Sequence, residues 1–359
     1  MGKFFLLQFP YQSHQEQYFR QSVFEYQILI KFPSFHQRHK EIKGFRLERG
    51  GLAFDPIFSD AIIFASLLAL LSIGLTLTYI TTRVPNFAHA SFATIGVYVA
   101  LIVTHVWGLS PYIAIPISFV ISGIVAVLLY TFILKPLIRK GASQAIQMIA
   151  TLAFDLVMIA MLNITADYIV KTYQITSREF SLRSYDFDFM GLPLIVIVAP
   201  ITIAVLAITL HIILRKTKFG IAMRAATENS DLAGTVGVNV KLIYLVSWLM
   251  GGGFAGIAGA LMSLWFQGDP NLGPMLIPSI FAASIAGGFL SIYGAIAGGI
   301  LVGLTEVLGT RFLAGEFGAW LIAYRPLIPL IFIVVTLFLA PKGLAGINWS
   351  KLRRNGSRT

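Results

Sequence analysis

Long apolar runs, separated by polar stretches rich in lysine and arginine, constrain this chain more than any other feature. We count about nine of them: 57–80, 87–107, 111–134, 146–164, 192–214, 242–266, 277–293, 295–310 and 320–339. A helix of about 20 apolar residues spans the hydrocarbon core of a bilayer. Only 12% of the residues are charged, against roughly a quarter in soluble domains. The sequence therefore predicts an all-α, polytopic membrane protein with about 8–10 transmembrane helices, some of them short or broken.

The charge distribution and the missing motifs exclude several functional classes. The formal charge of +11 comes largely from loops beside the apolar runs, so it indicates a membrane surface and no nucleic-acid partner. The absence of cysteine excludes disulfides and thiolate metal sites. The sequence has no GxxxxGK[ST] phosphate loop, no HExxH or GxSxG motif, and no histidines and carboxylates at metal-ligand spacing. We therefore expect a non-enzyme without its own metal or cofactor, for which any ATP is hydrolysed on another polypeptide.

Composition divides the chain into three parts. Residues 1–50 mix aromatic with basic side chains and hold no run long enough to span, so they form an N-terminal extension of unknown role. This extension is either a tail that binds a partner or the membrane surface, or a dispensable segment upstream of the true start. Residues 57–347 form the expected transmembrane domain, and residues 348–359 form a basic tail. The cations in that tail predict a cytoplasmic C-terminus.

The longest polar interruption, residues 215–241, predicts two short helices at the cytoplasmic surface. Four apolar residues share one helical stripe around Glu228: Ile221, Ala225, Leu232 and Val236. Asn229-Ser230 offers an N-cap for the second helix, and Gly237 offers a stop. The five lysines and arginines of this segment outnumber its two acidic residues, which places it in the cytoplasm.

The positive-inside rule leaves one conflict. Residues 165–190 lack a cationic excess, so we place them outside the membrane. An odd number of full spans with an inside C-terminus then puts the basic N-terminal extension outside, against the rule. We expect that one of the short, glycine-broken runs, 277–293 or 295–310, is re-entrant or consists of two half-helices.

A second polar stretch, PNFAHAS at residues 85–91, interrupts the apolar pattern. A proline ahead of polar residues is where a membrane helix can break and restart. The restarted helix has free N–H groups and a positive dipole end, which can hold an amino-acid carboxylate near the midplane of a transporter. Asn86, His89 and Ser91 would then line a substrate path. The alternative is a cytoplasmic turn at the membrane edge with a solvated histidine.

Glycines gather in the last third of the chain at helix-packing spacing. The expected packing residues are Gly252, Gly256, Gly259, Gly287, Gly288, Gly294, Gly298 and Gly299. Small residues let membrane helices approach closely, so these glycines predict ordinary packing or a dimer core around a translocation path.

Two acidic residues lie inside apolar runs, where a charge is costly unless it is paired or faces water. Asp155 and Glu306 are either carriers of protons or sodium ions, or structural residues that are paired within the protein. An ion-coupled secondary transporter of small solutes is therefore an alternative function.

Several segments together resemble one family, the branched-chain amino acid (LivH/LivM type) permeases of ABC importers. The segments are RAATENSDLAGTVGVNV, NFAHASFATIGVYVAL, the GxxAGxAG helix at 252–259, the GGxxSIxGAxxGG run at 287–299, and LFLAPKGLAGI near the end. The resemblance covers residues 57–347. Ala90 stands where the family has glycine, and Val97 where alanine is common, which weakens any strict backbone requirement there.

The resemblance implies a transport subunit in a prokaryotic cell membrane. Its expected partners are membrane lipid, a homologous or identical second permease, two cytoplasmic ABC ATPases that bind ATP, and an extracytoplasmic solute-binding protein. The family's ATPase-coupling loop corresponds to Arg224, Ala225, Glu228, Asp231, Ala233 and Gly237. Leucine, isoleucine and valine are the family's default substrates, and other amino acids, urea and short amides stay open.

Overall fold

The computed structural model describes residues 56–189, 191–340 and 343–346, which belong to one compact unit. The extension 1–50 and the basic tail 348–359 lie outside the described residues. Seven helical segments in this part are long and apolar enough to cross a membrane: α2 (Pro56–Thr82), His89–Val106, Pro111–Arg139, α6 (Gln144–Tyr173), α7 (Leu194–Lys216), α10 (Val240–Met262) and α12 (Ile292–Phe317). Two shorter apolar helices are α11 (Leu272–Gly287) and α13 (Leu327–Leu339). The predicted all-α membrane fold is confirmed.

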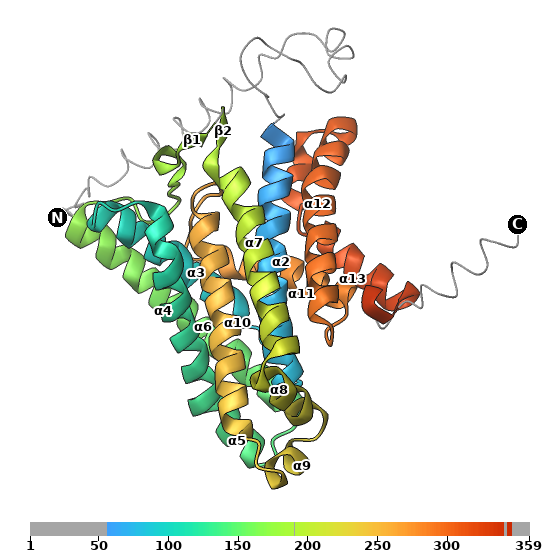
Figure 1. Ribbon diagram of the computed structural model, residues 1–359. Helices are drawn as coiled ribbons and strands as arrows, with labels where there is room; N and C mark the ends of the chain where they lie inside the picture. The colour runs from blue at the N-terminus through green and yellow to red at the C-terminus, as the bar shows by residue number, and fades with distance from the viewer. Residues whose placement is uncertain (1–55, 190, 341–342, 347–359) are drawn as a thin grey trace, which may run out of the picture. The chain divides into compact units, whose positions relative to one another are not determined.

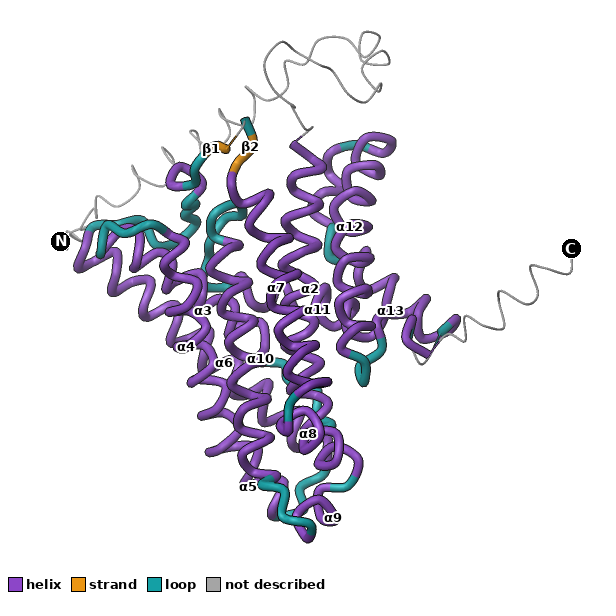
Figure 2. The backbone as a smooth tube through the Cα atoms, viewed as in Figure 1, coloured by secondary structure: helices purple, strands orange, loops and turns teal. Residues whose placement is uncertain are grey.

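Two of the long segments contain local changes of helix type. In His89–Val106, α3 (His89–Leu101) continues as π-helical η2 (Ile102–Val106). Pro111–Arg139 consists of four consecutive pieces: η3 (Pro111–Ile113), α4 (Ala114–Leu128), η4 (Leu129–Leu134) and α5 (Lys135–Arg139). The remaining short elements are η5 (Arg183–Tyr185), β1 (Asp188–Phe189), β2 (Leu192–Pro193), α8 (Lys218–Glu228), α9 (Ser230–Thr235), η6 (Ala319–Tyr324) and η7 (Leu344–Gly346). Figure 2 shows how little of the described chain is strand.

Three segment boundaries differ from the sequence prediction. The run 295–310, expected to be short and glycine-broken, is the interior of the unbroken 26-residue helix α12. Two of its glycines, Gly299 and Gly303, pack against α2, and Gly298 packs against α11, so these glycines serve packing and do not interrupt the helix. The run 320–339 is instead split, because Pro326 lacks an N–H donor and starts α13 anew. Helix α6 continues to Tyr173, beyond the end of its apolar run.

Helix α2 is the centre of the bundle, and its side chains are buried along almost its whole length. It packs against α10, α12, α7 and α11. Small residues make the closest of these approaches: a methyl group on Gly299 or Gly303 of α12 would overlap the backbone of Ala69 or Ala65. Such close backbone contact holds helices together in lipid, where apolar burial alone contributes little.

The bundle has two distinct ends (Figure 1). The β1–β2 hairpin precedes α7 at one end, here called the hairpin end, and α7 descends to α8 and α9 at the other. At the α8–α9 end, Arg83 beyond the last turn of α2 donates from Nη2 to the Thr227 carbonyl at 3.3 Å. Helix α2 therefore begins at the hairpin end and finishes beside α8.

Candidate functional site

Helix α3 begins inside the bundle. His89, its first residue, places Nε2 3.0 Å from the carbonyl oxygen of Leu71, near the middle of α2. Asn86, His89 and Ser91 are all buried. The segment after Thr82 therefore rises back into the bundle before the helix restarts. The alternative interpretation, a turn at the membrane edge with a solvated histidine, is wrong.

The chain's own residues satisfy much of the polar backbone at this break. The side-chain oxygen of Asn86 accepts from the N–H of Ala88 at 3.1 Å, and its carbonyl accepts from the N–H of His89 at 3.3 Å. The N–H of Phe87 donates to the hydroxyl of Thr151 on α6 at 3.3 Å. These bonds use donors that a bound carboxylate would otherwise accept from.

A carboxylate of the protein itself lies at the start of α3. The hydroxyl of Ser91 donates to Asp155 Oδ1 at 2.5 Å, and Asp155 is buried on α6. A negative charge is favoured there because the N-terminal end of a helix carries partial positive charge. Ser91 is therefore a hydrogen-bonded partner of Asp155, which the sequence predicted to be either an ion carrier or a paired structural residue.

Two polar atoms near the break have no hydrogen-bond partner among the described residues. They are Nδ2 of Asn86 and Nδ1 of His89. Because His89 Nε2 faces a carbonyl acceptor, we assign the proton to Nε2, which leaves Nδ1 as a free acceptor when the ring is neutral. The break therefore offers one donor and one acceptor that the described protein atoms leave unused.

Helix α11 covers the start of α3. A methyl group added to Gly273 would lie 3.2 Å from the Ser91 nitrogen and 3.2 Å from the Thr94 hydroxyl oxygen. The rings of Phe87 and Phe281 stack with centroids 5.0 Å apart. Residue type at position 273 thus controls how closely the two helices meet.

The predicted pair of short surface helices is confirmed as α8 and α9. The Asn229 side chain accepts from the N–H groups of Asp231 at 3.1 Å and Leu232 at 3.0 Å, so it is the N-cap of α9. Gly237 has a φ of 86°, a left-handed conformation that suits glycine at a helix stop.

Helix α8 is tied to the end of α7. Arg224 donates from Nη1 to the carbonyl of Leu214 at 2.6 Å, and the buried side of α8 consists of Gly220, Met223 and Ala226. Gly220 packs so closely on the Leu214 backbone that a methyl group there would overlap it. Movement of α8 is therefore mechanically linked to α7.

The outer side of α8 and α9 is unusually apolar for a polar segment. Ile221, Leu232 and Val236 are 60%, 63% and 72% exposed. Among the residues that the sequence assigned to coupling, Arg224, Glu228, Asp231 and Gly237 are exposed with them, Ala225 is half-buried, and Ala233 is buried. Ala233 therefore supports the loop from within and does not belong to its outer surface.

The packing glycines contact helices of this same chain. Gly252 and Gly256 approach α4, and a methyl group at Gly259 would overlap the Ala93 carbonyl of α3. Near the turn into α12, Gly287 lies on Gly294, Gly298 lies on Ala283 and Gly287, and Gly288 adopts a φ of 97°. These glycines therefore pack against helices of the same subunit. This differs from the interpretation that they form a core between two permeases.

Glu306 has a cationic partner within the membrane domain. Its carboxylate lies 2.7 Å from Nε of Arg325, which follows η6, and the Arg325 guanidinium lies 4.4 Å from the Phe64 ring centroid. Neither intramembrane carboxylate is therefore isolated. Among the described residues, no group of three or more histidines and carboxylates could hold a metal ion.

Comparison with known proteins identifies the family. A family model described as the permease component of branched-chain amino acid transport systems matches residues 57–340. The chain belongs to this family. It is 43% identical over 298 residues, 83% of this chain and 94% of the relative, to a probable branched-chain amino acid transport permease protein LivH of Methanocaldococcus jannaschii.

Other relatives include a permease that is named for a different substrate. The chain is 24% identical over 303 residues, 80% of this chain and 94% of the relative, to the high-affinity branched-chain amino acid permease LivH of Escherichia coli. It is also 30% identical over 276 residues, 75% of this chain and 73% of the relative, to the galactofuranose transporter permease YtfT of that species.

Within this permease, sequence reasoning missed the partners of its polar break. Thr151 and Gly273 lie far from PNFAHAS in sequence, on α6 and α11, and neither stands in a recognisable motif. The one available signal was Asp155, because an acidic residue inside a membrane segment requires a partner. A serine in the first turn of a buried half-helix is such a partner, but only the fold brings the two together.

Proposed function

We propose that this chain is the membrane-spanning subunit of an ATP-driven importer for branched-chain amino acids or related amino acids and amides. Separate cytoplasmic ATPases would drive it through residues 215–241. The observation that carries the proposal is the exposure of three large apolar side chains, Ile221, Leu232 and Val236, within the cationic segment 215–241. Large apolar side chains exposed on an otherwise polar loop fit a protein partner better than they fit water.

The contacts beneath this surface would transmit a movement of α8 and α9 to the membrane-spanning helices. A partner that grips α8 and α9 would pull on α7 through the Arg224–Leu214 bond and on α2 through the Arg83–Thr227 bond. Since α2 is the centre of the bundle, a shift at this end would alter its packing with the other helices.

The substrate path is proposed to pass the start of α3, with Asn86, His89 and Ser91 along it. Those residues are buried in this conformation, so transport requires a movement that uncovers them. The unused Nδ2 of Asn86 and Nδ1 of His89 would then supply a donor and an acceptor to a polar substrate group. Because the Asp155 carboxyl group lies there and can accept a hydrogen bond, an ammonium group would be favoured over a carboxylate nearest Ser91.

The proposed sidedness places the α8–α9 end in the cytoplasm and the hairpin end outside. Nine alternating passes then carry the chain from an outside start of α2 to an inside end of α13, in keeping with the cationic excess of residues 215–241 and 348–359. Gly343, after α13, lies against Gly288 at the start of α12. A second permease would join in the membrane of a prokaryotic cell, two ATPases would bind inside, and a solute-binding protein would dock outside.

The decisive experiment reverses one charge on the proposed docking surface. Glu228→Arg should abolish ATP-dependent leucine uptake in proteoliposomes that contain the partner subunits, while membrane insertion and thermal stability are retained. Glu316→Arg is a matched control, because Glu316 is also exposed but lies at the far end of α12. Unchanged uptake in Glu228→Arg would count against coupling through this loop.

The ion-coupled alternative makes an opposite prediction. The partners of Asp155 and Glu306 favour structural roles, because a carrier must release its charge during each cycle. Uptake by this chain alone, driven by an ion gradient and abolished by an uncoupler, would support the secondary transporter instead.

A further inference from the structure

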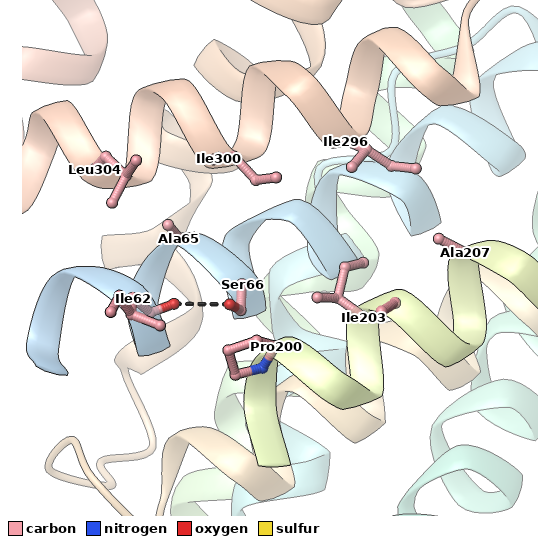
Figure 3. Close-up of a pocket in the computed structure, with 10 residues that line it drawn as sticks. Ile62, Ala65, Ser66, Pro200, Ile203, Ala207, Ile296, Ile300 and Leu304 are labelled. Atoms are coloured by element: carbon pink, nitrogen blue, oxygen red, sulfur yellow. Dashed lines mark hydrogen bonds between the residues drawn. The ribbon is translucent and has the colours of Figure 1, made fainter. Parts of the chain in front are cut away.

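A groove runs along the side of the bundle where α7 and α12 diverge over α2. Its volume is about 430 Å³, and its lining is Ile62, Ala65, Ser66, Pro200, Ile203, Ala204, Ala207, Ile296, Ile300 and Leu304. Figure 3 shows α2 as its floor, with side chains from α7 and α12 on the two sides. All three helices are membrane-spanning segments.

The lining calls for an apolar occupant. Ser66 is its one hydroxyl residue, and that hydroxyl donates to the Ile62 carbonyl at 2.7 Å (Figure 3). Ile201 and Ile208 on α7 are exposed beside the groove. A surface of this composition within membrane-spanning helices faces acyl chains, since no water is present to fill an open groove at that depth.

The end of the groove toward α8 is polar and cationic. The Tyr293 hydroxyl of α12 and Nδ1 of His211 on α7 lie 2.6 Å apart, which joins the two helices just below the lining residues. Arg215 and Lys216 follow one turn later on α7, and both are exposed. Within the described part of the chain, neither forms an ion pair with a carboxylate.

The groove and the polar cluster below it together extend over about one leaflet. From Pro200 to His211 the helix rises about 16 Å at 1.5 Å per residue, close to half of the roughly 30 Å hydrocarbon core. An acyl chain that lies beside Ile203 and Ala207 would therefore bring its headgroup to Tyr293, Arg215 and Lys216.

We propose that this groove is a binding site for an anionic phospholipid. One acyl chain would lie between α7 and α12, and the headgroup phosphate would be held by the two cations and the Tyr293 hydroxyl. Assignment to the cytoplasmic leaflet rests on the sidedness in the proposed function. The binding site itself does not depend on that sidedness. A bound lipid would brace α7, the helix that leads into α8, against α2 and α12.

The test measures lipid retained by the purified chain in native mass spectrometry, after exposure to micelles with equal phosphatidylglycerol and phosphatidylcholine. Ala207→Trp fills the groove and should remove most bound phosphatidylglycerol. Ala207→Leu, a smaller change, should remove part of it. Val205→Trp is the matched control on the exposed side of α7 and should retain lipid as the unmodified chain does.

The headgroup contact has its own variant. Arg215→Ser with Lys216→Ser should lower the preference for phosphatidylglycerol over phosphatidylcholine by about fivefold per lost cation, since each basic residue near an anionic surface contributes about 1 kcal/mol. Circular dichroism and a single gel-filtration peak establish that each variant is folded.

Two results would overturn the proposal. One is equal phosphatidylglycerol retention in Ala207→Trp, Val205→Trp and the unmodified chain. The other is loss of a chain dimer in Ala207→Trp with unchanged lipid, which would assign the groove to a second permease. Because the measurement needs neither transport nor ATPases, its failure leaves the proposed function separately testable.

Discussion

Arg325→Met removes the cation that faces the Glu306 carboxylate inside the membrane domain. The Glu306 side chain is 5% exposed and the Arg325 side chain 31% exposed, so the pair is largely shielded from water on the carboxylate side. The methionine keeps a long side chain whose sulfur can pack against the Phe64 ring, where the Arg325 guanidinium otherwise lies. The substitution therefore tests mainly the charge.

The magnitude follows from the burial of the two partners. Removing one partner of a fully buried pair costs about 3–5 kcal/mol, because the other charge is left uncompensated. The partial exposure of Arg325 lets water replace some of its effect, so we expect a loss of roughly 2–4 kcal/mol. That corresponds to a fall in melting temperature of about 4–12 °C, at roughly 2–3 °C per kcal/mol for a large domain.

A double-mutant cycle provides the assay. Melting in detergent, followed by tryptophan fluorescence, is compared for Arg325→Met, Glu306→Leu and the double variant. The double variant should lose about 1–3 kcal/mol less than the sum of the single losses, because removing both charges leaves none unpaired.

The exposed pair between Arg178 and Asp167 is the control, with atoms 3.0 Å apart and side chains 47% and 67% exposed. Its cycle should give a coupling below about 1 kcal/mol. Additive losses at Glu306 and Arg325 would refute the claim that the two residues stabilise the fold as a pair.

Three further predictions concern local packing and capping. Gly259→Leu should destabilise the protein by about 1–3 kcal/mol or more through overlap with α3, whereas Gly315→Leu, which meets no atom within 4 Å, should melt normally. Ser91→Ala should cost about 1–3 kcal/mol by leaving Asp155 without its donor, and Ser91→Thr should restore the melting temperature; equal melting of all three proteins would exclude the bond. Asn229→Ala should raise hydrogen exchange of the α9 amides roughly fivefold, for a lost cap of about 1 kcal/mol, and unchanged exchange would show that the side chain does not cap α9.

Local sequence determined most of the long helices and the two short helices within residues 215–241. Apolar runs of membrane length predicted the long helices. Backbone N–H and C=O groups must be hydrogen-bonded within the protein in lipid, and a helix satisfies them within a single segment. Asn229 and Gly237 predicted the start and stop of α9, since capping depends on residues within a few positions of the helix end. Family resemblance, carried by short segments in a fixed order, predicted the family that comparison then established.

Glycine spacing showed the limit of such local reasoning. It predicted that helices pack closely, but it was silent on which helices meet. Gly299 and Gly303 of α12 contact α2 and Gly298 contacts α11, all within the same chain. They leave α12 unbroken because the neighbouring helices fill the space that their missing side chains would have taken.

The polar centre was decided by tertiary structure. Proline and asparagine at the break predicted where α3 restarts, but the partners of that break come from α2, α6 and α11, across large separations in sequence. Asp155 meets Ser91 only because α6 passes the start of α3. A buried charge must find a partner, and sequence reveals that need; the three-dimensional path of the chain determines which residue meets it.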